Sequence, residues 1–154
     1  MTTSDVNALS PSQWMRQNPA DLNALTSSQW RSLTVDSIRS ITASQWGLIS
    51  SQGIGALDPQ QWGVMATDDL RGLQASQWQT LSPDALGALT ALQWMAIATD
   101  DLRAIPQGHW PRLGSEDLRA LSPVQWSSLS TQTLNALQSA QWAILDPIDL
   151  RSLT

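Results

Sequence analysis

Apolar residues recur along this chain with a period of eight residues, and the pattern runs through residues 2–153 as nineteen octapeptides without an insertion. One position in each octapeptide, here called the key position, is held alternately by tryptophan and by an aliphatic residue. A second apolar residue lies three positions later, with Gln17 as the one exception. Such fixed self-similarity is typical of a repeat architecture. The tryptophans are Trp14, Trp30, Trp46, Trp62, Trp78, Trp94, Trp110, Trp126 and Trp142.

The spacing of the apolar residues excludes both a simple strand and one continuous helix. Steps of three and five residues would place successive apolar side chains on opposite faces of a strand. In a continuous helix at roughly 100° per residue, the apolar stripe would drift by about 80° in each octapeptide. The chain is therefore predicted to start a new helix in every octapeptide.

Residues that favour helix N-caps mark each predicted start. Four residues before the key position, thirteen octapeptides carry Ser, Thr, Asn or Asp, and proline often follows at the first helical position. Gln13 lies three residues after Ser10, which is the spacing of a capping box. The predicted caps are Thr2, Ser10, Asn18, Thr26, Thr34, Thr42, Ser50, Asp58, Ser82, Thr90, Ser122, Ser130 and Asp146.

Helices of about six residues do not persist alone in water, so they must stack on one another. We therefore expect an all-α solenoid of about nineteen short capped helices, forming a single repeat domain over residues 1–154 without distinct capping repeats. The tryptophan alternation suggests an even number of octapeptides per turn, so that tryptophan stacks on tryptophan. Two per turn is the simplest choice. Four per turn is the alternative, because the joints mostly lack the glycine that helical hairpins prefer.

The tryptophans admit two interpretations. They form either an aromatic strip that stacks on sugar rings or a structural ladder inside the core. Because Leu or Ile takes the same position in alternate octapeptides, we expect the core ladder. In the aliphatic octapeptides, only Ala, Ser or Gly stands two residues after the key position, which predicts close approach of neighbouring helices.

Glutamine precedes eight of the nine tryptophans, and capping alone does not explain it because Asp or Glu would cap as well. One hypothesis is an amide ladder in which each side chain donates to the next carbonyl between successive turns. The other is recent duplication that copied glutamine without selection. The glutamines are Gln13, Gln29, Gln45, Gln61, Gln77, Gln93, Gln125 and Gln141.

One octapeptide is irregular. Pro111 falls inside the predicted helix, where proline costs about 3 kcal/mol, and Pro106, Gly108 and His109 stand in the same unit. Functional sites often lie where local rules fail. A single histidine without Cys or carboxylates at ligand spacing is nevertheless a weak metal ligand or base. We expect tolerated decay of the repeat, and we predict no catalytic, cofactor-binding or metal-binding residue.

Composition narrows the range of partners. The chain has no Cys, and its net charge of −5 argues against a nucleic-acid groove or an anionic membrane surface. No apolar run approaches the ~20 residues of a membrane span, and the N-terminus does not read as a signal peptide. Asp68, Asp100 and Glu116 lie three residues before an arginine, which predicts exposed ion pairs along the helices.

The segments Leu25–Trp30 and Leu121–Trp126 follow the pattern Leu-Thr/Ser-x-x-Gln-Trp. This pattern resembles the octapeptide tracts, Leu-Thr-x-x-Gln-aliphatic, of large exported bacterial surface proteins described as adhesin-like. The resemblance implies repeat architecture, and it favours an extracellular or cell-surface location over a cytoplasmic one. It transfers no catalytic or haem-ligating residue, and tryptophan in alternate units departs from those tracts.

The sequence therefore favours a non-enzymatic repeat scaffold that needs no cofactor. Such a scaffold serves as a structural spacer or a protein-interaction surface, within a larger exported adhesin or in an end-to-end assembly. Both ends keep apolar residues in phase with the repeat, so the expected partner is protein, including a second copy of the chain. The alternative is a surface-binding module whose Trp or Ser/Thr rows bind polysaccharide or ice.

Overall fold

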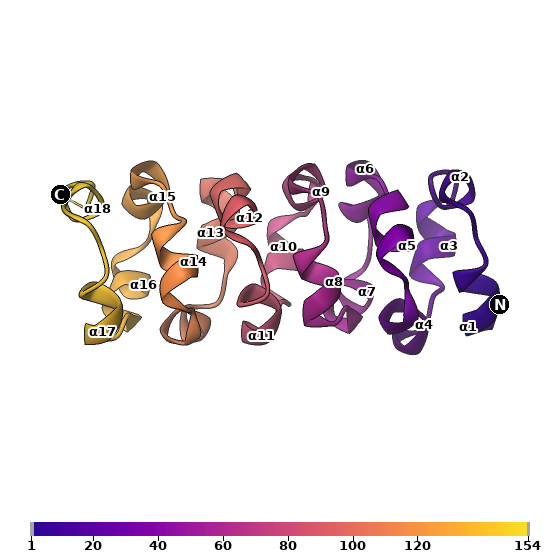
Figure 1. Ribbon diagram of the computed structural model, residues 1–154, viewed down its shortest axis with the longest axis horizontal. Helices are drawn as coiled ribbons and strands as arrows, with labels where there is room; N and C mark the ends of the chain where they lie inside the picture. The colour runs from indigo at the N-terminus through magenta and orange to yellow at the C-terminus, as the bar shows by residue number, and fades with distance from the viewer. Residues whose placement is uncertain (1, 154) are drawn as a thin grey trace.

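The computed structural model describes residues 2–153, which form an elongated all-α solenoid with the chain termini at opposite ends (Figure 1). Each helix has four to six residues, one helix per octapeptide. The helices are α1 (Thr3–Asn7), α2 (Pro11–Trp14), α3 (Pro19–Asn23), α4 (Ser27–Ser32), α5 (Val35–Ser40), α6 (Ala43–Trp46), α7 (Ser51–Ala56), α8 (Pro59–Gly63), α9 (Thr67–Gly72), α10 (Ala75–Trp78), α11 (Pro83–Leu86), α12 (Ala91–Ala96), α13 (Thr99–Ala104), the 3-10 helix η1 (Gln107–Arg112), α14 (Ser115–Arg119), α15 (Pro123–Ser128), α16 (Thr131–Ala136), α17 (Ser139–Trp142) and α18 (Pro147–Arg151).

All thirteen predicted caps stand at the N-cap of a helix. The start of α4 shows the chemistry. Thr26 has extended backbone angles, its hydroxyl accepts from the N–H of Gln29 at 3.3 Å, and its own N–H donates to Gln29 Oε1 at 2.8 Å. Two N–H groups that would otherwise lack partners at the helix start are thus satisfied within one octapeptide.

The chain turns between helices without a left-handed residue. Within residues 2–153 no residue has a positive φ. At the end of α4, Leu33 (φ −61°, ψ 133°) and Thr34 (φ −72°, ψ 163°) are both extended, and together they redirect the chain into α5. Because two extended residues make this corner, glycine is not required there, which explains its scarcity at the joints.

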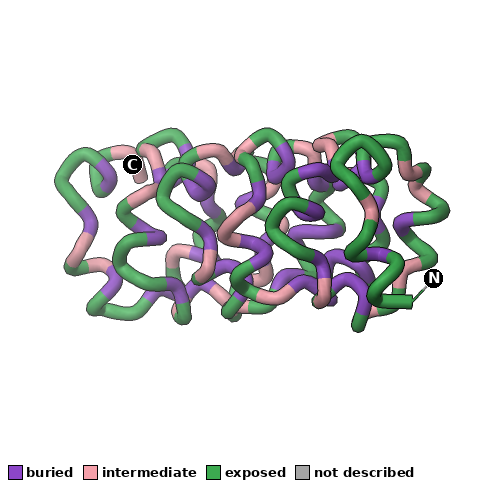
Figure 2. Tube along the Cα trace, turned by 45° about the vertical axis from the view of Figure 1, so that its right-hand side comes forward, coloured by how far each residue is buried: buried purple, intermediate pink, exposed green. Residues whose placement is uncertain are grey.

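About three octapeptides make one turn of the solenoid, so the expectation of an even number, two or four, was wrong. The principal contacts join each helix to the helix three places along, as in α6 with α9, α10 with α13, and α15 with α18. Figure 2 shows the chain winding in successive coils, with exposed segments at the outer margins and buried segments facing inward.

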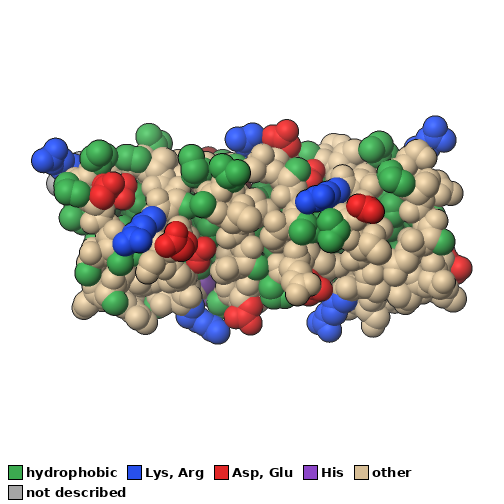
Figure 3. All heavy atoms as spheres, viewed as in Figure 1, with side chains coloured by type: hydrophobic (Ala, Val, Ile, Leu, Met, Phe, Trp, Pro, Cys, Tyr) green, Lys and Arg blue, Asp and Glu red, His purple; other side chains and the backbone are tan. Residues whose placement is uncertain are grey.

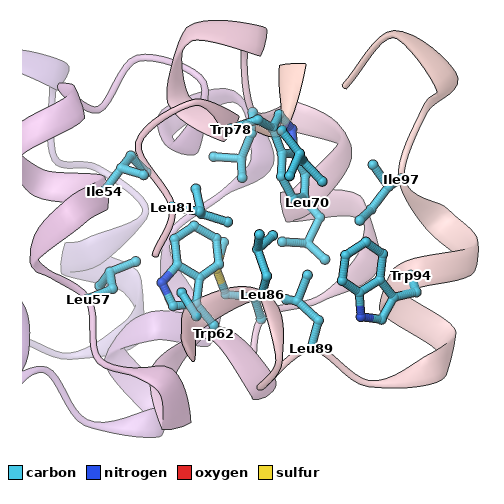
Figure 4. Packing of buried hydrophobic residues seen from close by; sticks show 14 of the residues in the cluster. Ile54, Leu57, Trp62, Leu70, Trp78, Leu81, Leu86, Leu89, Trp94 and Ile97 are labelled. Atoms are coloured by element: carbon cyan, nitrogen blue, oxygen red, sulfur yellow. The ribbon is translucent and has the colours of Figure 1, made fainter. Parts of the chain in front are cut away.

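An odd number of octapeptides per turn places tryptophan over an aliphatic residue in every column of helices. Large side chains then lie between smaller ones, which fills a core more evenly than large on large. Figure 4 shows Leu70 and Leu86 lying between Trp62, Trp78 and Trp94. The tryptophans are therefore core residues that alternate with aliphatic ones, rather than a continuous aromatic stack.

The core runs through the solenoid along its length. From Trp14 to Trp126 every indole is at most 1% exposed, and most aliphatic key residues are equally buried. Among the described residues, ring contacts between tryptophans are limited to Trp30–Trp46, with centroids 6.0 Å apart, and Trp94–Trp110, at 6.5 Å. At the C-terminal end, Leu150 is 43% exposed.

The small residues of the aliphatic octapeptides allow the predicted close helix approach, most clearly between α6 and α9. A Cβ atom on Gly72 of α9 would collide with the main-chain oxygen of Ala43 in α6. A Cβ on Gly47 would likewise collide with the main-chain oxygen of Gly72. The backbones of these two helices thus meet where side chains are absent.

The irregular octapeptide keeps its place in the stack. It forms η1, which contacts α11 and α16, and Trp110 at its key position is fully buried. Pro111 is accommodated because the segment winds as a 3-10 helix instead of an α-helix. A Cβ on Gly108 would meet no atom within 4 Å, so glycine is not needed there for space.

Candidate functional site

The most regular polar feature of the molecule is a set of side-chain amides that join one turn to the preceding turn. The amide nitrogen of Gln77 donates to the main-chain oxygens of Trp46 and Ile49, both at 2.7 Å. Its Oε1 accepts from the N–H of Gln74 at 2.6 Å. The same pair of interturn bonds, at offsets of 31 and 28 residues and 2.7–3.0 Å, is made by Gln45, Gln61, Gln77, Gln93, Gln125 and Gln141.

This geometry accounts for glutamine where a carboxylate would serve as a cap. The side chain must accept at the N-terminus of its own helix and donate to carbonyls of another turn, and a carboxylate cannot donate. The accepting carbonyls lie where a short helix ends, so they have few helical partners. The predicted donation to a carbonyl between turns is present in these six glutamines, but the acceptors are main-chain carbonyls and not the side-chain amides of other glutamines.

The first two glutamines of the series lie near the N-terminal end. Gln13 is exposed, and its Oε1 accepts from the N–H of Ser10 at 2.8 Å. Gln29 is buried, and its Oε1 accepts from the N–H of Thr26. Both glutamines therefore keep the capping function of the series.

His109 takes the place of glutamine in η1, and the structure gives it the same interturn role. Its Nε2 lies 3.0 Å from the main-chain oxygen of Leu81, at the 28-residue offset that the glutamines use. Because a carbonyl only accepts, Nε2 must carry the proton. The capping acceptor is not needed here, since Pro106 at the N-cap has no N–H. In this unit, Pro106 lacks the N–H that glutamine would cap, and His109 keeps the bond to the preceding turn.

The indole N–H groups make a second set of interturn contacts. Six of them are buried without a hydrogen-bond partner, and they belong to Trp14, Trp46, Trp78, Trp94, Trp110 and Trp126. Two contacts locate the residue that faces an indole nitrogen. A Cβ on Gly53 would lie 2.9 Å from Nε1 of Trp30. Burial raises the pKa of Asp117, and the nearby Trp94 indole offsets part of that rise. Both contacts join residues 23 positions apart (53 − 30 and 117 − 94).

Several acidic side chains at this facing position titrate abnormally. Burial raises the pKa of Asp69 to about 6, an effect that the N–H of Ala66 partly offsets. Burial and the neighbouring Asp100 raise the pKa of Asp101 to about 6. Burial also raises the pKa of Asp117, against the N–H of Gly114. These carboxyl groups therefore ionise less readily than exposed ones.

The outer surface carries the three predicted ion pairs. Arg71 lies 2.9 Å from Asp68, Arg103 2.9 Å from Asp100, and Arg119 3.8 Å from Glu116. Figure 3 shows arginine and acidic side chains lying side by side on one face. All of these side chains are exposed, so each pair contributes little to stability.

Some arginines also bond to a main-chain carbonyl 25 residues further along, a role that sequence reasoning missed. Arg103 Nε donates to the oxygen of Ser128 at 2.8 Å, and Arg31 Nε donates to that of Ala56 at 3.3 Å. To predict these bonds from the sequence, one would have had to compare each arginine with the residue 25 positions later, which is close to three octapeptides away.

The contacts that these side chains make are hydrogen bonds and packing contacts between turns. Within residues 2–153, no group of three or more His, Asp or Glu side chains is placed to hold a metal ion. Among the same residues, no helix combines the length and the apolar character of a bilayer span. The glutamines and tryptophans that the sequence singled out lie between turns of the solenoid. Pro106, Gly108, His109 and Pro111 all belong to one unit of the stack, the one that contains η1.

Comparison with known proteins supports the repeat. A family model described as the ALTTAQ repeat matches residues 111–147, about a quarter of the chain. This segment includes α14, α15, α16 and α17 and is therefore similar to such repeats. A search of curated proteins finds no match.

Proposed function

We propose that this chain is a non-enzymatic repeat scaffold, a spacer of defined length that also presents surface for protein partners. The observation that carries the proposal is the interturn bonding. Glutamine amides tie each turn to carbonyls 28 and 31 residues earlier, and a continuous core lies between the turns. We expect a solenoid held in this way to resist bending and stretching, because a large deformation of either kind would break buried hydrogen bonds.

The similarity of residues 111–147 to the ALTTAQ repeat supports the proposal that this chain is a tract of repeats. On the resemblance of its octapeptides to tracts of exported bacterial surface proteins, we place the chain in an extracellular, adhesin-like context. No cofactor is required for this function, and the proposed partners are proteins rather than nucleic acid or a membrane interior.

The C-terminal end supports end-to-end association. Leu150 occupies a key position but is 43% exposed, and Trp142 is only partly buried, whereas their interior equivalents Trp94 and Leu102 are at most 1% exposed. In the interior, a following turn covers these side chains. At the end of the 154-residue chain, the corresponding cover is the N-terminal turn of a second copy; in a longer polypeptide it is the next turn of the same chain.

The polysaccharide or ice alternative has less support. The indoles from Trp14 to Trp126 are at most 1% exposed, so their ring faces are not free to stack on a sugar. That alternative would depend on exposed Ser and Thr side chains instead.

The scaffold proposal is tested by small-angle X-ray scattering of the purified chain, which should give the profile of a stiff rod. A profile of a flexible or compact particle would contradict it. Association is tested separately by light scattering across concentrations. We expect the mass to rise with concentration and Leu150→Glu to abolish the rise, while Leu92→Glu, at a 71% exposed position on α12, should leave it intact. A constant monomer mass would refute end-to-end association and leave the scaffold proposal standing.

A further inference from the structure

The buried indole N–H groups follow a rule that links each tryptophan to one residue in the next turn. In each of the six cases without a hydrogen-bond partner, the residue 23 positions later carries a side-chain oxygen. Trp30 and Trp62 are outside that set, and the residues 23 positions after them are Gly53 and Ala85. The oxygen-bearing residues are Ser37, Asp69, Asp101, Asp117, Thr133 and Asp149.

Contacts between the helices agree with this assignment. Asp69 lies on α9, which packs on α6, the helix of Trp46. Asp101 lies on α13, which packs on α10, the helix of Trp78. Asp117 lies on α14, which packs on α12, the helix of Trp94, and its carboxyl interacts with that indole.

The helices packed against these carboxyl groups supply no compensating charge. The principal neighbours are α6 and α12 for Asp69, α10 and α15 for Asp101, and α12 for Asp117, and none of these four helices contains a charged residue. The charged residues on the same elements are Asp68 with Arg71, Asp100 with Arg103, and Glu116 with Arg119. These arginines are exposed, and each pairs with the exposed acid beside the buried one.

We propose that Asp69, Asp101 and Asp117 are proton-responsive contacts between turns, which hold the solenoid tightly in mild acid and loosen it when they ionise. The neutral carboxyl group packs against the apolar neighbours beside the indole and leaves no charge in the site. The contact with the Trp94 indole favours the ionised form of Asp117 but offsets burial only in part. The ionised group must keep a full charge in the same half-dry site, with no cation opposite it. This inference depends on the fold alone and goes beyond the scaffold function.

The direction of the pH effect follows from linkage. The pKa of Asp69 and of Asp101 is raised from 3.8 to about 6 in the folded chain. A raised carboxyl pKa contributes stability that is fully present below the unfolded value and is lost as pH rises through the folded value. Between about pH 5 and about pH 7.5, each such group should lower the folding equilibrium constant about tenfold.

The test is urea unfolding of the full chain across this pH range. We expect the wild-type midpoint to fall as pH rises and the double variant Asp69→Asn, Asp101→Asn to lose most of that fall. Asparagine keeps the shape and an acceptor oxygen but cannot ionise. The matched control is Asp68→Asn, Asp100→Asn, which removes exposed carboxylates from the same two helices and should keep the wild-type pH dependence. Any effect of His109, the one histidine, is common to all three proteins and cancels in the comparison.

A second measurement uses the indoles directly and requires no variant to fold. In the wild-type protein, the Nε1–H resonances of Trp46 and Trp78 should shift with pH with a midpoint near 6. A wild-type urea midpoint that is constant or rises with pH would overturn the proposal. So would indole resonances that do not titrate, or an equal pH dependence in the two double variants.

Discussion

At the residue scale, six of the glutamines that precede a tryptophan bond in two directions, to their own helix and to the preceding turn. Gln77 accepts from the N-terminal N–H of its own helix and donates to two carbonyls of the preceding turn, and it is 3% exposed. Aspartate at the corresponding position of the aliphatic octapeptides accepts in the same way, as Asp69 does from Ala66, but has no donor when ionised. The tryptophan octapeptides therefore carry most of the side-chain hydrogen bonding between turns.

We predict that Gln77→Glu destabilises the protein by about 2–4 kcal/mol at neutral pH, because it replaces a donor by a buried anion facing two carbonyls. The control is Gln79→Glu, an exposed position two residues later, which should change stability by less than about 0.5 kcal/mol. Chemical denaturation measures both. Equal effects at the two positions would show that the interturn bonds contribute nothing.

A second prediction at this scale concerns the core. Leu86 at a key position is fully buried, whereas Leu48, outside the two apolar positions, is 58% exposed. Leu86→Ala should cost about 2–5 kcal/mol, since it removes buried methyl groups and leaves a cavity. Leu48→Ala should change stability by less than about 0.5 kcal/mol. Urea unfolding that gave equal losses would contradict the assignment of the key position.

At the scale of the element, each helix is too short to form alone. Isolated helices shorter than ~12 residues are marginal in water, and these have four to six residues. An N-cap side chain contributes about 1 kcal/mol, which sets where a helix starts but does not hold it. Packing of each helix on those three places away supplies the remaining stability.

The close contact between α6 and α9 gives a prediction at this scale. Gly72→Ala should destabilise by about 1–3 kcal/mol, because its Cβ would meet the main-chain oxygen of Ala43 and force the helices apart. The matched control is Gly55→Ala in α7, where a Cβ would meet nothing within 4 Å. That change should stabilise by about 0.5–1 kcal/mol through a less flexible unfolded chain. Thermal unfolding followed by circular dichroism compares the two, and effects of the same sign would argue against the close approach.

At the scale of the whole molecule, two periods must agree. Three octapeptides complete about one turn, and two octapeptides complete one tryptophan–aliphatic alternation, so the arrangement repeats after six octapeptides. This agreement keeps a large residue over a small one in every column of the core.

Internal deletions test this agreement. Removing residues 51–98, which are α7 to α12, should give a shorter rod that unfolds cooperatively, because both periods are preserved. Removing only 51–74, which are α7 to α9, should give a less stable protein, although more of the chain remains. That deletion brings Trp78 over Trp30 and overfills the column. Urea unfolding and X-ray scattering measure the two deletions, and a more stable protein after the shorter deletion would refute the packing rule.

The sequence by itself determined the features that arise within one octapeptide. Cap residues such as Thr26, the two apolar positions and the exposed ion pair of Asp68 with Arg71 were all predicted and are present. Each depends on residues at most four positions apart, and local backbone geometry specifies such contacts. The all-α solenoid followed from them, because short helices must stack.

Only the tertiary structure decided how the octapeptides are arranged around the axis. The number per turn depends on the angle at each corner, and packing between residues some 25 to 31 positions apart selects that angle. The sequence pattern suggested tryptophan on tryptophan, but the core places Leu86 between indoles because large and small side chains fill space together better. The carbonyl partners of Gln77 and the role of His109 depend on the same angle, so they emerged only from the folded chain.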